Sequence, residues 1–120
     1  MDRQSVGRKN FYDGLAAEAG IERRYCDGGG KVAARRWRGA AGEVDLIVRK
    51  GAELIFVEVK KARDFARAAE SLSMRQLARI TSAAEEFVGA EPLGALTSFR
   101  IDLALVNEQG ESRIIENVTM

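Results

Sequence analysis

The sequence predicts a mixed α/β domain built on one central β-sheet, with the element order αβββαββ. Apolar residues recur at helical spacing in Ser5–Tyr25 and again in Met74–Val88. Between these helices, Gly42–Ile47 and Ile55–Lys60 are rich in branched apolar residues and are separated by a short turn, which is typical of a β-hairpin. Two more apolar segments of strand length close the chain, namely Phe99–Val106 and Arg113–Val118.

The first half of the chain supplies one helix and three strands. In the first helix, Phe11, Leu15 and Ala19 form one apolar stripe, which we expect to face the sheet. The glycine-rich segment Asp27–Gly30 then breaks the helix. A short strand over Lys31–Trp37 precedes the hairpin, whose turn we expect to be centred on Lys50-Gly51.

The second half supplies one helix and two strands. Lys61–Leu72 is polar and alanine-rich, which indicates a loop or an irregular helical start. Ser73 is placed to cap the second helix, in which we expect Met74 and Phe87 to belong to the core. Arg100 and Asp102 alternate with apolar residues in the next strand, which is consistent with an ion pair on one sheet face.

Length and composition indicate one soluble domain over residues 1–120. The chain has 120 residues, of which 46% are hydrophobic and 31% charged, as in ordinary globular domains. No apolar stretch approaches the ~20 residues of a membrane span. Met1–Ser5 lacks the apolar segment of a secretory signal. We therefore expect a cytoplasmic protein with no membrane partner.

Four charged residues of the hairpin share one face. Side chains alternate between the two faces of a strand. Glu43 and Asp45 therefore project from one face of the first strand, and Glu58 and Lys60 from one face of the second. With a turn centred on Lys50-Gly51, Glu43 lies opposite Glu58 and Asp45 lies opposite Phe56. Two carboxylates and an ammonium in otherwise apolar strands are costly to bury without a partner or a metal. This cost makes the group a candidate functional site.

An ordinary explanation stays open beside this one. The charged face of an antiparallel hairpin often meets water, where Glu58 and Lys60 would form a solvated pair of little energetic consequence. Against this, Ile55, Val57 and Val59 make the other face of the second strand wholly apolar. A strand that is apolar on both sides and charged at one end suits a central strand whose end opens into a cleft.

The absence of histidine restricts the chemistry. It excludes Ser-His-Asp and Cys-His mechanisms and zinc sites built on imidazole. Cys26 is the sole cysteine, so no intramolecular disulfide can form. Hydrolysis by this chain would need carboxylates, lysine and a hard metal ion.

Positive charge is concentrated just before the candidate site although the net charge is only +1. Basic residues with an interleaved Trp37 could line a groove that follows phosphates. A polar sheet edge guarded by arginines explains the same pattern. The residues concerned are Lys31, Arg35, Arg36 and Arg38.

The motifs resemble those of the YraN family of small bacterial proteins, which is assigned to the restriction-endonuclease-like fold, or PD-(D/E)XK nuclease superfamily. Gly42–Ile47 resembles its "GEIDLI" signature and Phe56–Lys60 its "FVEVK". Three weaker matches accompany these motifs. Ala17-Glu18 stands where the family has Gly-Glu. Ser98–Asp102 resembles an "RFD" strand, and Ile115–Asn117 resembles "IENAF".

The resemblance implies a restriction-endonuclease-like fold with a central mixed sheet flanked by helices. It implies that Asp45, Glu58, Glu18 and the Val59 carbonyl hold Mg²⁺ or Mn²⁺, and that Lys60 assists catalysis. Such oxygen ligands suit Mg²⁺. Gln76 and Arg75 begin the second helix and could reach a scissile phosphate or its attacking water; alternatively, they belong to a solvated first turn, an explanation that suits Arg75 better than Gln76.

Two functions follow from these expectations, and a third possibility is a protein-interaction module whose acidic cluster only stabilises a loop. The first is a metal-dependent endonuclease that hydrolyses DNA, including branched or structured DNA, with a homodimer supplying a second active site. The alternative is a non-catalytic nucleic-acid-binding or adaptor protein that retains the nuclease fold. The near-neutral charge favours the alternative, whereas the set of Asp45, Glu58 and Lys60 favours the enzyme.

Overall fold

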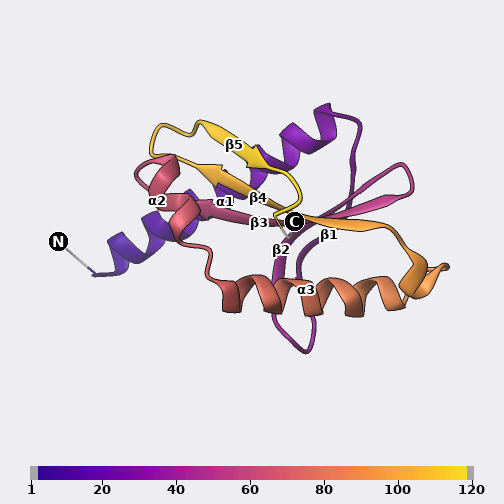
Figure 1. Cartoon of the computed structure of the whole chain (residues 1–120). Helices are drawn as coiled ribbons and strands as arrows, with labels where there is room; N and C mark the ends of the chain where they lie inside the picture. The colour runs from indigo at the N-terminus through magenta and orange to yellow at the C-terminus, as the bar shows by residue number, and fades with distance from the viewer. Residues whose placement is uncertain (1–2, 119–120) are drawn as a thin grey trace.

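A computed structural model of the chain describes the backbone of residues 3–118 and the side chains of residues 14–118. One five-stranded sheet lies between two long helices (Figure 1). The strands are Lys31–Arg38 (β1), Glu43–Lys50 (β2), Glu53–Lys61 (β3), Phe99–Val106 (β4) and Ser112–Ile115 (β5). The helices are Arg3–Asp27 (α1), Phe65–Glu70 (α2) and Met74–Gly89 (α3), with a 3₁₀ turn at Gly94–Leu96 (η1). The predicted mixed α/β class is confirmed.

The strands lie in the sheet in their chain order, β1-β2-β3-β4-β5. All neighbours are antiparallel except β3 and β4, which are parallel. A parallel pair needs a long crossover connection, and α2 and α3 supply it. The parallel pairing brings the carboxyl end of β3 beside that of β4, with Glu58 next to Leu103.

Two elements differ from the sequence prediction. The segment expected as a loop or an irregular helical start contains the regular short helix α2, which Asp64 caps by accepting the Arg67 N–H at 2.9 Å. The last strand ends at Ile115, three residues before the predicted Val118. Asn117 has a φ of 54°, a left-handed conformation that is incompatible with a continuing strand.

Helix α1 packs on one sheet face through a different stripe from the predicted one. Ala17, Ile21 and Tyr25 are buried against the sheet, whereas Ala19 is exposed. Ile21 and Tyr25 bury more apolar surface than Ala19 could, so they decide which face of this part of α1 is buried. Leu15 is half-buried, and the Phe11 side chain lies outside the described residues.

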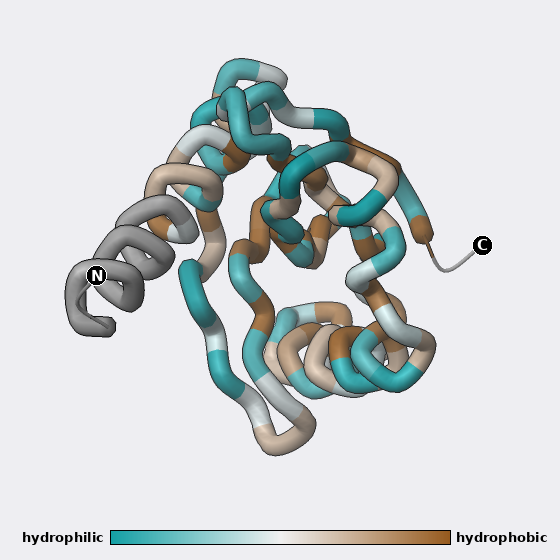
Figure 2. The backbone as a smooth tube through the Cα atoms, turned by 90° about the vertical axis from the view of Figure 1, so that its left-hand side faces the viewer, coloured by the Kyte–Doolittle hydropathy of each residue, from teal (hydrophilic) through white to brown (hydrophobic). Residues whose placement is uncertain are grey.

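Helix α3 covers the opposite face of the sheet. Its residues alternate between hydrophobic and hydrophilic along the turns (Figure 2), and Ile80, Ala84 and Val88 are buried. Ser73 caps the helix as predicted, since its hydroxyl accepts the Gln76 N–H at 3.0 Å. Met74 is 82% exposed rather than in the core, because it begins the helix ahead of its buried positions. No described helix combines the length and apolar character that a membrane span needs.

Candidate functional site

The β2–β3 hairpin turns at Gly51-Ala52, one residue later than predicted. Gly51 has a φ of 61°, which the tight turn requires. Lys50 therefore pairs with Glu53, and Leu46 with Val57. The predicted pairing of Asp45 with Phe56, and of Glu43 with Glu58, is wrong by two residues. A shift of two residues leaves every side chain on its predicted face of the strand. The next pair after Leu46 and Val57 in the observed register would be Asp45 and Glu58.

The two strands separate at Asp45. Leu46 and Val57 are the last paired residues of β2 and β3 toward that end. Beyond them, the Val59 N–H donates to Asp45 Oδ2 at 2.8 Å. A side-chain oxygen thus satisfies a backbone donor of the separating strand. This bond fixes the Asp45 carboxylate at the opening between the strands.

Glu58 is the centre of the site. Its side chain is only 9% exposed, and its carboxyl group interacts with that of Asp45. Lys60 Nζ lies 3.6 Å from Glu58 Oε1, and Gln76 Nε2 donates to the same oxygen at 3.3 Å. The structure therefore brings together the predicted Asp45, Glu58, Lys60 and Gln76, from β2, β3 and α3.

Burial and nearby charges raise the pKa of both carboxyl groups. Burial, followed by the nearby Asp45 charge, raises the pKa of Glu58 from 4.5 to about 8, although Lys60 opposes the change. Burial also raises the pKa of Asp45, and the Glu43 charge adds to this effect, whereas the Val59 N–H, Glu58 and Lys60 oppose it. The pKa of Glu58 rises because desolvation and the second carboxylate together outweigh the one ammonium group at 3.6 Å. The pair therefore holds a proton at neutral pH.

Glu18 approaches the pair from α1. Its carboxylate accepts a hydrogen bond from Arg36 Nε at 3.1 Å. Burial raises the pKa of Glu18, and the Asp45 charge adds to this effect while Arg36 opposes it. Glu18 and Asp45 line one pocket of about 300 Å³ between α1, β1 and β2. The other lining residues are Leu15, Ala19, Glu22, Arg35, Arg36 and Leu46.

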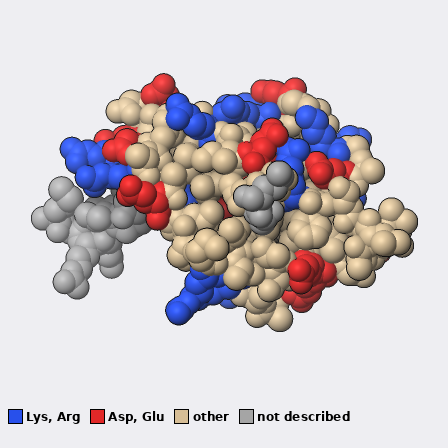
Figure 3. Space-filling view, in the orientation of Figure 1, with Lys and Arg blue, Asp and Glu red and all other residues tan. Residues whose placement is uncertain are grey.

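Each of the three predicted phosphate-binding arginines of β1 has an acidic partner. Arg35 makes two contacts with Glu22, one of 3.2 Å; Arg36 binds Glu18, and Arg38 NH2 lies 3.3 Å from Glu43 Oε2. Glu43 is consequently turned to Arg38 at the surface. Lys31 lies at the far end of β1, opposite Arg49. Basic and acidic side chains are interspersed over the face seen in Figure 3 rather than gathered into one basic patch.

The donor set suits a hard divalent cation held by two carboxylates. Among the described residues, no three acidic or thiol side chains form a ready-made metal cage. Mg²⁺ commonly takes one or two carboxylates and completes its shell with water and substrate oxygens. Asp45 and Glu58 meet that requirement, and Glu18 lines the same pocket as Asp45. Val59 contributes its N–H to Asp45, and a ligand role for its carbonyl stays a prediction.

The family model "Uncharacterised protein family UPF0102" matches residues 17–106. The chain belongs to this family. UPF0102 is the YraN family under another name, so the resemblance read from the motifs is confirmed. The UPF0102 match includes every residue of the candidate site, from Glu18 to Gln76, and stops at the end of β4.

Several UPF0102 proteins are similar to this chain over almost their whole length. One from Cereibacter sphaeroides (strain ATCC 17029 / ATH 2.4.9) is 53% identical over 111 residues, which cover 92% of this chain and 95% of the relative. One from Ruegeria pomeroyi is 52% identical, covering 94% of this chain and 92% of the relative. A third, from Ruegeria sp. (strain TM1040), is 40% identical with 98% and 94% coverage.

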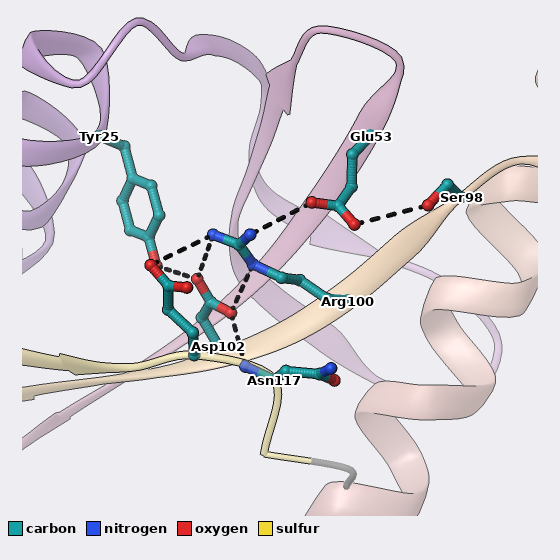
Figure 4. A network of polar contacts seen from close by, with 7 residues as sticks. Tyr25, Glu53, Ser98, Arg100, Asp102 and Asn117 are labelled. Carbon is teal, nitrogen blue, oxygen red and sulfur yellow. Dashed lines mark hydrogen bonds and ion pairs between the residues drawn. The ribbon is translucent and has the colours of Figure 1, made fainter.

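A second polar cluster, which the sequence showed only in part, lies on the α1 face (Figure 4). The predicted ion pair is present, with Arg100 Nε 3.0 Å from Asp102 Oδ1. Asp102 is fully buried and also accepts from the Tyr25 hydroxyl at 2.7 Å and from the Asn117 N–H at 3.0 Å. Arg100 reaches Glu53 as well, at 3.2 Å. This cluster is internally satisfied, so we assign it a structural role.

Proposed function

We propose that the protein is a metal-dependent nuclease that hydrolyses phosphodiester bonds in DNA, including branched or structured DNA. The observation that carries the proposal is the convergence of the buried Glu58 and the half-buried Asp45 carboxyl groups at the point where β2 and β3 separate. Asp45 is held there by the Val59 N–H, and Glu58 by Lys60 and Gln76. A buried carboxyl pair without enough compensating charge is typical of a functional site.

Each residue has a definite role in this proposal. Asp45 and Glu58 hold Mg²⁺ or Mn²⁺, with Glu18 and the Val59 carbonyl as further oxygen ligands. When bound, the ion polarises a phosphoryl oxygen and lowers the pKa of water. Lys60 stabilises the negative charge that develops on the phosphate, and Gln76 orients the attacking water or the phosphate. A homodimer would place a second such site on the opposite strand of a duplex.

The alternative is a nucleic-acid-binding or adaptor protein without catalysis. The pairing of Arg35, Arg36 and Arg38 with acidic residues favours it, because less positive charge is then available for phosphates. The two functions differ in whether the bound nucleic acid is cut.

Cleavage of a substrate panel tests the proposal. The panel includes single strands, duplexes, flaps, forks and four-way junctions, each with Mg²⁺, Mn²⁺ or EDTA. We expect cut products only with metal, and none from the Asp45→Asn or Glu58→Gln variant. Binding without cleavage under every metal condition would support the adaptor, and equal cleavage by wild type and Asp45→Asn would place the activity elsewhere.

A further inference from the structure

Two arginines of α3 differ from those of β1 in their surroundings. Arg75 and Arg79 are exposed, and neither forms an ion pair with an acidic residue in the described part of the chain. Residues three and four positions apart are neighbours on a helix. Those around Arg79 are Arg75, Gln76, Ser82 and Ala83, none of them acidic. These two positive charges are therefore not neutralised locally.

The same helix segment borders the candidate site. Gln76, whose amide donates to Glu58 at 3.3 Å, lies directly after Arg75 and one turn before Arg79. A Cβ atom built on Gly42 would lie 4.0 Å from the Arg79 Cβ, so the base of Arg79 lies at the entrance to β2. Arg75 and Arg79 therefore lie before and after Gln76 in the helix, and Arg79 also lies near the start of the strand that carries Asp45.

The loop between β1 and β2 lies against the other half of α3. The Ala40 N–H donates to Glu86 Oε2 at 2.9 Å, and Trp37 packs edge-on against Phe87 with 5.3 Å between ring centroids. Glu86 is thereby turned to the loop, beyond the segment that carries Arg75 and Arg79. The amino-terminal half of α3 keeps its positive charge, and the carboxyl-terminal half supports the loop.

We propose that the sugar–phosphate backbone of the nucleic acid crosses the amino-terminal half of α3, where Arg75 and Arg79 bind phosphates next to the Asp45–Glu58 pair. This inference rests on the proposed nucleic-acid function and names the surface that serves it. Arg79, which the sequence patterns did not single out, is a phosphate-binding residue of this surface. The arginines of β1 contribute less, because a phosphate must first displace Glu18, Glu22 or Glu43 from them.

The salt dependence of binding tests the inference. Fluorescence anisotropy with labelled DNA in EDTA gives the affinity at several salt concentrations for wild type and for the Arg75→Gln, Arg79→Gln double variant. The plot of log K against log salt has a negative slope, and each lost phosphate contact makes it less steep by about 0.9 on duplex DNA. The slope of the double variant should therefore be less steep than that of wild type by about 2. At ~0.1 M salt this corresponds to a roughly ten- to hundredfold lower affinity.

A matched control removes the same charge elsewhere. Arg23 and Lys50 are exposed, and Lys50 lies at the turn end of β2, away from Asp45. We expect the Arg23→Gln, Lys50→Gln double variant to keep the wild-type slope. Unfolding curves of both double variants verify that the fold is intact.

The outcomes separate this inference from the proposed function. If wild type binds DNA but the α3 variant keeps its slope, or the control loses as much, the surface is wrong while the nuclease proposal stands. A larger loss on removing Arg35, Arg36 and Arg38 together would place the backbone on β1 instead. If wild type binds none of the labelled substrates, whether single strand, duplex, flap, fork or four-way junction, the proposed function fails and this inference with it.

Discussion

Glu58→Gln should stabilise the metal-free protein at alkaline pH. The carboxyl group of Glu58 keeps its proton in the folded state up to a pKa of about 8, whereas in the unfolded chain it ionises near 4.5. Between these values the unfolded state binds fewer protons than the folded state, so the free energy of unfolding falls as the pH rises. A glutamine cannot ionise and avoids this loss.

The magnitude follows from the interval between the two pKa values. At about 1.4 kcal/mol per pKa unit, the interval corresponds to a loss on the order of 5 kcal/mol that is complete above about pH 8. At about pH 7 the loss is on the order of 3 kcal/mol. Below about pH 4.5 both states are protonated, and this source of difference between wild type and variant vanishes.

Chemical denaturation in EDTA at about pH 5, 7 and 9 measures the effect. We expect the stability of Glu58→Gln, relative to wild type, to increase steadily across this series. Glu85→Gln, which changes an exposed glutamate of α3, serves as the control and should follow wild type. Parallel pH dependences for wild type and Glu58→Gln would refute the reasoning. Mg²⁺ or Mn²⁺ should then stabilise wild type, through binding to the folded state, and leave Glu58→Gln nearly unchanged.

Three further predictions concern catalysis and packing. Asp45→Asn should keep the fold but lower the rate of metal-dependent cleavage by more than roughly 100-fold, because losing even a residue that only supports a metal ligand can cost that much. Initial rates on a substrate that wild type cuts will measure the loss. Lys60→Ala should lower the cleavage rate at saturating metal by about 10²–10³ while calorimetry finds the metal affinity little changed; an equal loss in both would argue against charge stabilisation. Gly30→Ala should cost about 1–3 kcal/mol in denaturation experiments, because the new Cβ would lie 2.6 Å from Val48 Cγ1. Gly20→Ala, with open space around it, should be neutral or stabilising, and an equal cost at both positions would show that packing is not the cause.

Local patterns predicted most of the secondary structure. Strand alternation, the Ser73 cap and the helical spacing of Met74–Val88 each depend on residues close in sequence, and each matches the structure. Alternation also placed Asp45 and Glu58 on one side of the hairpin, because an error of two residues in the register does not change the direction of a side chain.

Features that depend on distant residues were not predicted. The position of the turn was ambiguous because Gly51 belongs to both candidate two-residue turns, Lys50-Gly51 and Gly51-Ala52, and either turn would pair the two strands. The separation of β2 from β3 depends on the Asp45 carboxylate accepting the Val59 N–H, fourteen positions away. Likewise, the acidic partners of Arg35 and Arg36 lie on α1, and spacing within β1 carries no sign of them.

The buried Asp102 ties together three parts of the chain that are far apart in sequence. Its carboxylate needs the Tyr25 hydroxyl, the Arg100 guanidinium and the Asn117 N–H at the same time. Detaching any one of them leaves a buried charge with fewer partners, which raises the free energy of every partly opened state. The end of α1, strand β4 and the residues after β5 should therefore open as a single cooperative unit, with backbone amides that exchange their hydrogens together.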